Sequence, residues 1–172
     1  MNFSNITVEI KKELIDVVGD NYCLTEKNSI EDYCHDETED LNFPPEVVVK
    51  PANTNEVSEI MKLAFEYNIP VTPCGARTGL SGGALCVYGG IALSMERFNK
   101  IIKIDEDNLQ VITQSGVITQ ELQEAVLEKG LYYAPDPSSR GTCFIGGNIA
   151  ENSGGPRAVK YGVTKDFVLN LE

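Results

Sequence analysis

Residues 141–157 read GTCFIGGNIAENSGGPR, and the interpretation of the whole chain starts from this stretch. Two Gly-Gly pairs, at 146–147 and 154–155, bracket a run that is too small and polar to form a core. Because glycine lacks a Cβ, successive backbone N–H groups can turn toward one point and form a concavity suited to an anion. The stretch therefore predicts a loop that approaches a phosphate or the edge of a flavin.

Two common phosphate motifs do not fit this stretch. Gly141 and Gly146 have the outer spacing of a P-loop, but Gly147 and Asn148 stand where that motif has Lys and Ser or Thr. A dinucleotide fingerprint needs G-x-G-x-x-G between a strand and a helix, and the sequence does not arrange three glycines in this way. The Walker and Rossmann interpretations are both rejected.

A second glycine-rich stretch, PCGARTGLSGG at residues 73–83, follows a predicted strand–helix–strand unit. Residues 47–49 (VVV) predict a buried strand, and residues 70–73 predict a second one. Between them, Asn53 or Thr54 caps a helix that closes at Asn68. The apolar face expected for this helix is Val57, Ile60, Met61, Ala64 and Phe65. A right-handed βαβ unit would place the glycine-rich loop at the carboxyl end of a parallel sheet, where ligands of α/β folds bind.

Residues 73–83 together with 141–172 resemble the FAD-binding domain of the FAD-linked oxidases, a family that includes enzymes of the glycolate oxidase and D-lactate dehydrogenase type. The resemblance runs from about Tyr33 to the last residue. It implies an α+β fold of the vanillyl-alcohol-oxidase or PCMH type, with a small parallel βαβ lobe followed by part of an antiparallel α+β lobe. In that family two glycine-rich loops hold the pyrophosphate and ribityl chain of FAD between two lobes.

The resemblance also implies which residues bind FAD, and it implies no catalytic residue and no metal ligand in this chain. The expected cofactor-binding residues are Pro73, Gly75, Ala76, Arg77, Thr78, Gly79, Leu80, Ser81, Gly82, Pro135, Asp136, Gly141, Thr142, Gly146, Gly147, Asn148, Ala150, Ser153, Gly154, Gly155, Tyr161 and Gly162. Tyr161 can also be interpreted as a core aromatic residue, and the core interpretation is slightly favoured over cofactor contact. FAD is expected to bind noncovalently, because residues 75–83 contain no His like the one that links flavin in some relatives.

The first loop departs from the family pattern at two positions. Relatives usually have a basic residue where Cys74 stands and a glycine where Arg77 stands. If that glycine position requires a positive φ, Arg77 is strained there by about 1 kcal/mol or more. The alternative is that the exchange moves the phosphate-facing cation from one side of the loop to the other.

The function implied by the resemblance is hydride transfer from the α-carbon of a 2-hydroxy acid of the D-lactate or glycolate type to FAD. The chain would be the N-terminal FAD-binding portion of such a dehydrogenase or oxidase, inactive alone, with electrons passed to an electron-transfer flavoprotein or an iron–sulfur subunit. Alternatives are a non-catalytic truncated or accessory subunit, and the FAD domain of a molybdenum hydroxylase or an enolpyruvyl-glucosamine reductase. The expected domains are an N-terminal helical and acidic segment, 1–42, and an incomplete FAD-binding domain, 43–172, without its C-terminal part and substrate domain.

Composition and charge exclude several other classes of function. The chain has 172 residues, 42% of them hydrophobic, and contains no apolar run long enough to span a bilayer. No basic and apolar leader is present at the start, so a cytoplasmic location is expected. A net charge of −12 argues against nucleic acid as a partner. Residues 138–165 are locally basic, which suits a bound pyrophosphate as well as it suits a solvated surface.

Cysteine and histidine give no separate catalytic motif. The five cysteines (Cys23, Cys34, Cys74, Cys86, Cys143) are odd in number and unpaired in spacing, so reduced and mostly buried thiols are expected. His35, the only histidine, lies in the acidic stretch 26–40 with no partner motif, and a structural role is expected for it. Since no Ser/His/Asp set or metal cluster is found, a cofactor must carry any reaction.

The remaining elements follow from periodicity and turn residues. Apolar positions predict a helix over residues 4–18 that ends at Gly19, and residues 26–40 are interpreted as a loop or short helical turns. Residues 91–95 predict a strand, and residues 101–104 and 109–113 a hairpin. Thr119 is expected to cap a helix that ends by Gly130, with Leu122, Ala125 and Val126 on its apolar face.

Overall fold

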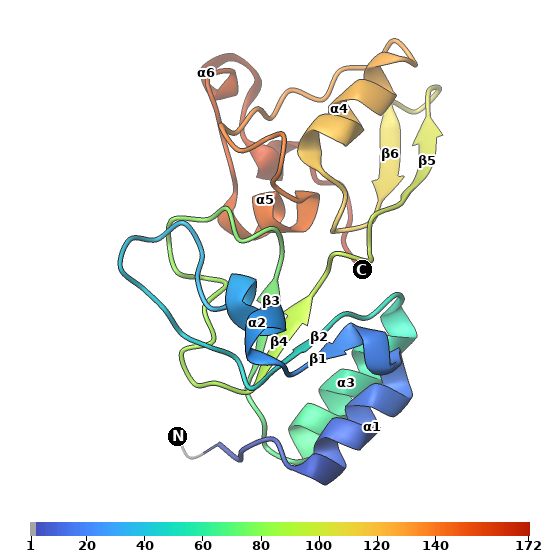
Figure 1. Cartoon of the computed structure of the whole chain (residues 1–172). Helices are drawn as coiled ribbons and strands as arrows, with labels where there is room; N and C mark the ends of the chain where they lie inside the picture. Colours follow the sequence, from blue (N-terminus) through green and yellow to red (C-terminus); the bar gives the residue numbers. More distant parts are fainter. Residues whose placement is uncertain (1–2) are drawn as a thin grey trace. The chain divides into compact units, whose positions relative to one another are not determined.

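The computed structural model describes residues 3–172, which form two compact units that divide between Arg97 and Phe98 (Figure 1). Both units mix helices with a small sheet. The first sheet is mainly parallel and the second is antiparallel. This arrangement confirms the predicted α+β class, with a parallel lobe followed by an antiparallel one. The domain boundary expected at residue 42 stays a prediction.

The first unit is built on a four-stranded sheet in the order β1-β2-β4-β3. Its strands are β1 (Cys23–Leu24), β2 (Val47–Val49), β3 (Val71–Cys74) and β4 (Ile91–Ser94). Strands β2 and β3 are each parallel to β4, and β1 is antiparallel to β2. The expected βαβ unit therefore has β4 between its two strands. All four residues of β4 are buried, whereas β3 carries Pro73, which has no N–H and is tolerated at an edge.

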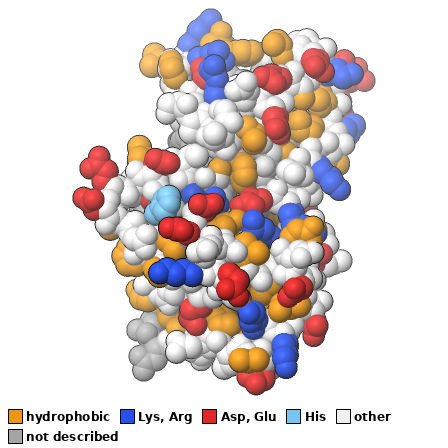
Figure 2. Space-filling model, viewed as in Figure 1, with side chains coloured by type: hydrophobic (Ala, Val, Ile, Leu, Met, Phe, Trp, Pro, Cys, Tyr) orange, Lys and Arg blue, Asp and Glu red, His pale blue; other side chains and the backbone are white. Residues whose placement is uncertain are grey.

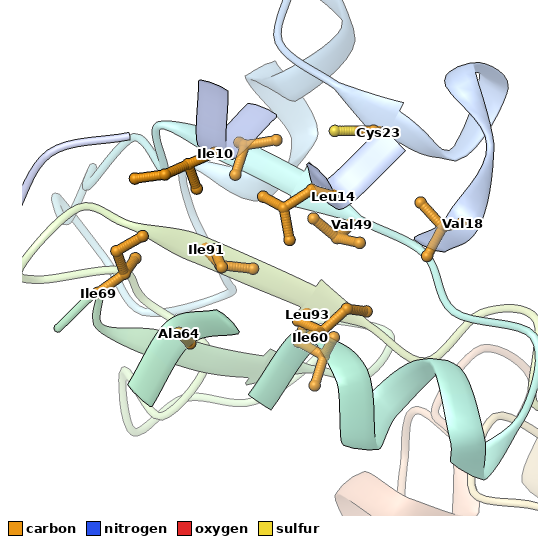
Figure 3. Packing of buried hydrophobic residues seen from close by; sticks show 11 residues of the cluster. Ile10, Leu14, Val18, Cys23, Val49, Ile60, Ala64, Ile69, Ile91 and Leu93 are labelled. Atoms are coloured by element: carbon orange, nitrogen blue, oxygen red, sulfur yellow. The ribbon is translucent and has the colours of Figure 1, made fainter. Parts of the chain in front are cut away.

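Two helices, α1 (Val8–Val18) and α3 (Thr54–Glu66), cover one face of this sheet (Figure 3). Their buried residues pack on alternate residues of β2 and β4, including Val49, Ile91 and Leu93. Helix α1 begins four residues later than expected. The Thr7 hydroxyl caps it by accepting a hydrogen bond from the backbone of Ile10, and residues 3–7 have no regular secondary structure.

The apolar face of α3 is rotated from the predicted one. Ile60 and Ala64 are buried as expected, but Met61 is 45% and Phe65 is 89% exposed. The reason is the position of α1, which approaches the opposite flank of α3, where the Tyr67 hydroxyl donates to Glu13 Oε1 at 2.8 Å. The predicted cap at Asn53 is confirmed, because its side chain accepts from the backbone N–H of Glu56 at 3.0 Å.

The other face of the sheet is covered by short elements and loops. The single-turn elements η1 (Asp20–Tyr22), α2 (Lys27–Ile30) and η2 (Glu31–Tyr33) confirm the short helical turns expected within residues 26–40 and add one before them. A second core on this face consists of buried Tyr33, Val48, Cys74, Cys86 and Ala92. All five cysteines are buried and free, as the sequence predicted. Strand β1 was not predicted, because two residues carry too little pattern.

The second unit contains the predicted hairpin, β5 (Ile101–Asp105) and β6 (Gln110–Thr113), with a register shift between Ile101 and Lys103. Helix α4 (Thr119–Leu127) packs on it through buried Leu122 and Val126. The N-cap is Ile118 and not the predicted Thr119, because the Thr119 side chain turns inward and is fully buried.

Three more elements complete the second unit: α5 (Ile145–Glu151), α6 (Ala158–Tyr161) and η3 (Thr164–Phe167). Helix α5 lies inside the stretch that was predicted to be a glycine-rich loop. Ile145 anchors it in the core with Val117 and Leu122, and this burial outweighs the low helix propensity of the adjacent Gly-Gly pair.

Candidate cofactor-binding site

The first glycine segment, residues 75–83, follows edge strand β3 and is largely free of regular structure. It is attached to the acidic stretch by a hydrogen bond from the backbone of Glu37 to the carbonyl of Gly79, at 3.0 Å. Arg77 has a φ of 59°, so the strained conformation anticipated for a non-glycine residue at this position is present.

Gly79 has no evident structural need to be glycine. An ideal Cβ built on it would have no heavy atom within 4 Å, and its φ lies outside the left-handed region. Neither packing within the described residues nor backbone conformation therefore explains the missing side chain. Open space above a bare backbone fits the close approach of a ligand.

A polar cluster lies beside the first glycine segment, at the carboxyl ends of the parallel strands. We call Tyr33, Lys50, Arg77 and Glu96 the Glu96 cluster. Lys50 Nζ donates to Glu96 Oε2 at 2.8 Å, and the Tyr33 hydroxyl donates to Glu96 Oε1. The Arg77 guanidinium lies 4.2 Å from the Tyr33 ring centroid and 3.6 Å from Glu96 Oε1. The cluster joins residues that follow β2, β3 and β4 to a residue of η2.

The ionisation of this cluster is set by competition between burial and hydrogen bonding. Burial raises the pKa of Glu96, but hydrogen bonds from Lys50 and Tyr33 outweigh it, so the pKa lies below its ordinary value of 4.5. Burial alone would lower the pKa of Lys50, whereas its hydrogen bonds to Glu96 and Tyr33 raise it overall. Glu96 is therefore a carboxylate and Lys50 an ammonium group at neutral pH.

Cys74 and Cys86 flank the first glycine segment on its buried side. The Cys74 thiol contacts the carbonyl oxygen of Ala84 at 3.4 Å, and its hydrogen bond to Cys86 raises its pKa, as burial also does. The same hydrogen bond lowers the pKa of Cys86. These thiols belong to the core under the segment and are closed off from solvent.

The second glycine segment, residues 141–157, contains α5, and the two glycines of its first pair differ in environment. A Cβ on Gly146 would lie 2.7 Å from the Cβ of Ser115, where the backbone of Gly146 donates to the Ser115 carbonyl at 2.7 Å. A Cβ on Gly147 would have no heavy atom within 4 Å. Gly146 is thus required by packing inside the unit, whereas Gly147 is bare toward open space, like Gly79 in the first unit.

Asp136 ties this segment together. Its side chain is 8% exposed, and it accepts from Arg140 Nη1 at 2.7 Å and lies 3.2 Å from Arg157 Nε. The backbone of Gly155 passes so close that a Cβ there would overlap the carbonyl oxygen of Asp136, and its φ of 148° is itself unfavourable for other residues. An open cavity of about 470 Å³ adjoins this arrangement, lined by Gln120, Asp136, Pro137, Ser138, Arg140, Gly141 and Pro156.

Asn148 connects α5 to α4. Its side chain is buried, and Nδ2 donates to the Thr119 hydroxyl at 2.5 Å, which in turn donates to the Cys143 carbonyl at 3.2 Å. The side chain that the sequence indicated for cofactor contact is therefore part of the internal structure of the unit.

The other predicted site residues divide between surface and interior. Exposed or partly exposed positions are Pro73, Gly75, Ala76, Thr78, Leu80, Ser81, Gly82, Gly141, Thr142, Ala150, Ser153, Gly154 and Gly162, while Pro135 is buried. Tyr161 is 43% exposed and stacks edge-on with Tyr132, so the favoured core interpretation of this residue is wrong. His35 is at the surface, with acidic side chains around it in Figure 2, and not in a core.

The sequence patterns did not indicate Tyr33, Lys50 and Glu96. Each follows or lies near a predicted strand or turn, but they are far apart in the chain and no motif joins them. The polar residues that follow each predicted parallel strand could have indicated them, because such residues meet at one edge of the sheet.

Two further properties hold for residues 3–172. No group of three or more His, Cys, Asp or Glu side chains is placed there to hold a metal ion. No helix in this range combines the length and apolar character needed to cross a membrane.

Comparison with known proteins gives concordant results. The family described as FAD binding domain matches residues 45–172. Glycolate oxidase subunit GlcD of Bacillus subtilis (strain 168) is 44% identical over 168 residues, which are 97% of this chain and 36% of that protein. D-lactate dehydrogenase of Anaerostipes hadrus is 47% identical over 139 residues, 80% of this chain and 29% of that protein. The chain thus spans about a third of the length of these relatives.

Among solved structures, alkyldihydroxyacetonephosphate synthase matches with a TM-score of 0.85 and 22% identity, over 96% of this chain and 33% of that one. At this level of identity the match shows a shared fold and nothing more.

Proposed function

This chain belongs to the FAD binding domain family, and from that premise we propose that it is the FAD-binding portion of a flavin-dependent 2-hydroxy-acid dehydrogenase or oxidase. The names of its relatives, a glycolate oxidase component and a D-lactate dehydrogenase, support a small 2-hydroxy acid as the substrate of the full enzyme. The proposal gives this chain the task of holding the cofactor, and it names no residue of the chain as a catalytic base.

The observation that carries the proposal is the bare backbone at Gly79 and Gly147. Each lies in a glycine segment within the range that matches the family, and each has open space where a side chain would be. Both glycines fit a ligand that approaches the main chain closely. Gly146 and Gly155 differ, because packing inside the second unit already explains why they are glycine.

Local charge also fits an anionic cofactor. Lys50 and Arg77 outnumber the single carboxylate of Glu96 in the Glu96 cluster, and the acidic stretch that contains Glu37 also adjoins the first glycine segment. Arg140 and Arg157 against Asp136 leave one net positive charge beside the second glycine segment. In a chain of net charge −12, the pair Arg140 and Arg157 against one carboxylate favours an anionic group beside the second glycine segment.

When bound, FAD supplies the acceptor for the hydride of a 2-hydroxy acid. We assign Gly75, Ala76, Thr78, Gly79 and the exposed residues Leu80, Ser81 and Gly82 to noncovalent contact with it in the first unit. In the second unit the corresponding surface is Gly141, Thr142, Gly147, Ala150 and the cavity beside Asp136. An electron-transfer flavoprotein or an iron–sulfur subunit as electron acceptor, and a cytoplasmic location, complete the proposal.

The test is a titration of the purified chain with FAD, followed by flavin absorbance and by limited trypsin digestion. Saturable binding with protection of the bonds after Arg140 and Arg157 is expected. Riboflavin, which lacks the diphosphate, is expected to bind less well. Cleavage after Lys62, an exposed residue on α3, is the internal control and should not change. A chain that neither binds FAD nor gains protection at Arg140 and Arg157 overturns the proposal that it holds the cofactor.

A further inference from the structure

The Arg77 side chain points into the fold and not toward solvent. Only 19% of it is exposed, because the guanidinium stacks on the Tyr33 ring at 4.2 Å and Nη1 donates to the carbonyl of Gly75 at 3.4 Å. The nearest carboxylate, Glu96, is 3.6 Å from the same nitrogen. A guanidinium held in this way is not available as a free phosphate ligand at the surface of the segment.

The backbone conformation of Arg77 needs support from its side chain. A residue with a side chain is disfavoured at a φ of 59°, and such strain persists only where the surroundings fix it. The stacking on Tyr33 and the attraction to Glu96 are the contacts through which the side chain can hold this turn. Arg77 is the third of the nine residues in the first glycine segment, so its conformation sets the direction of the amides that follow it.

Glu96 is itself held from two sides. It follows β4, the central strand of the sheet, and its two carboxylate oxygens accept from Lys50 after β2 and from Tyr33 of η2. Its side chain is 32% exposed, and that of Lys50 is 21% exposed. Because Glu96 is held against the sheet, its carboxylate also fixes the position of the Arg77 guanidinium.

We propose that Glu96 is a positioning residue for the first glycine segment: it anchors Arg77 inside the fold, so that residues 75–83 present backbone N–H groups to the cofactor while the cation acts from beneath. This inference rests on the proposed function. Arg77 then contributes one partly buried positive charge to the site without contacting the phosphate.

The experiment is a double-mutant cycle between Glu96→Gln and Arg77→Gly in the full chain. Amide hydrogen exchange is measured by mass spectrometry, without ligand, on peptides from α3 and on peptides that contain Glu37 or Leu85. The backbone N–H groups of Glu37 and Leu85 donate to the carbonyls of Gly79 and Gly82, so their exchange reports the position of residues 75–83. Glu96→Gln is expected to accelerate exchange of the Glu37 and Leu85 amides by about fivefold to tenfold and to leave exchange in α3 within about twofold of the wild-type rate. In the Arg77→Gly background, Glu96→Gln should have no further effect on exchange of the Glu37 and Leu85 amides, because Glu96 acts through Arg77.

Two variants separate positioning from general stability. Glu59→Gln makes the same chemical change at an exposed pair with Lys62 and should leave residues 75–83 unchanged. Arg77→Lys keeps the charge but loses the planar stacking on Tyr33, so it should resemble Glu96→Gln. The proposal is overturned if exchange accelerates equally at Glu37, at Leu85 and in α3, or if Glu96→Gln has its full effect when Arg77 is absent.

A FAD titration of the same variants completes the test. Glu96→Gln is expected to raise the Kd for FAD by about threefold to tenfold. Coupled exchange with an unchanged Kd overturns the role of Glu96 in cofactor binding. If the wild-type chain binds no FAD, the proposed function fails, whereas the exchange cycle still decides whether Glu96 sets the conformation of residues 75–83.

Discussion

Replacing Gly147 by alanine should make the chain more stable and weaken its affinity for FAD. Gly147 is a residue of α5 with a φ outside the left-handed region, and a Cβ there meets no heavy atom within 4 Å. Glycine within a helix destabilises it by roughly 0.5–1 kcal/mol relative to alanine. For a chain of this length that gain corresponds to a rise in Tm of about 1–4 °C. The added methyl group would fill the space that the proposal gives to the cofactor.

The neighbouring glycine provides the matched contrast. Gly146→Ala places its Cβ 2.7 Å from Ser115, so we expect a loss of about 1–3 kcal/mol from overpacking. Ser58→Ala, at an exposed position of α3, controls for helix stabilisation outside the site, and it should raise Tm slightly with no change in FAD affinity.

The assays are thermal unfolding by circular dichroism and FAD titration of each variant. For Gly147→Ala we expect a higher Tm and a Kd raised about tenfold, the effect of ~1.4 kcal/mol. A lower Tm would show that the space around Gly147 is not open. A higher Tm with unchanged affinity would refute the argument that this bare backbone faces the cofactor.

Three further predictions concern charge and backbone. Asp136→Asn leaves Arg140 and Arg157 without a carboxylate, so Tm should fall by about 2–4 °C. Arg140→Gln keeps the ion pair between Asp136 and Arg157, so it should lower Tm less. Equal losses of Tm in the two variants would contradict the shared role of Asp136. Gly155→Ala should be destabilised by about 2–3 kcal/mol in urea unfolding, because its Cβ overlaps the Asp136 carbonyl; wild-type stability would show that the backbone can move away. The folded pKa of Glu96 is depressed, so its contribution to stability is present above the ordinary value of 4.5 and is lost as pH falls through the lower folded value; wild type and Glu96→Gln should therefore differ at pH 7 and converge in acid, and a constant difference would refute this.

Local patterns were sufficient for most elements of the fold. The β-branched run at 47–49, the periodic residues of α1 and the polar turn of the β5–β6 hairpin each specify one structure through short-range chemistry. The central place of β4 could not be predicted in this way, because strand order is decided by which faces are buried and not by the strand itself. Met61 and Phe65 were misplaced for a similar reason, since only α1 determines which flank of α3 is covered.

The candidate site could be predicted only in part, because composition locates the glycine segments but not the contacts that form on folding. Glycine composition drew attention to both segments, but it does not distinguish Gly147, which is bare, from Gly146, which is packed against Ser115. The resemblance indicated the unusual position of Arg77, and its left-handed backbone agrees with that expectation. Its stacking on Tyr33 and its proximity to Glu96 join segments that are distant in the sequence and meet only once the sheet has formed.

The single carboxylate of Asp136, shared by Arg140 and Arg157, closes the second glycine segment into a ring held by charge. Such a ring opens more easily when mobile ions screen its partners, and both arginines are partly accessible to solvent. Local opening of α5 and its flanking turns should therefore increase with ionic strength, while opening of the apolar sheet of the first unit should not. Added salt should loosen residues 136–157, whereas the apolar core between the sheet and helices α1 and α3 should keep its stability.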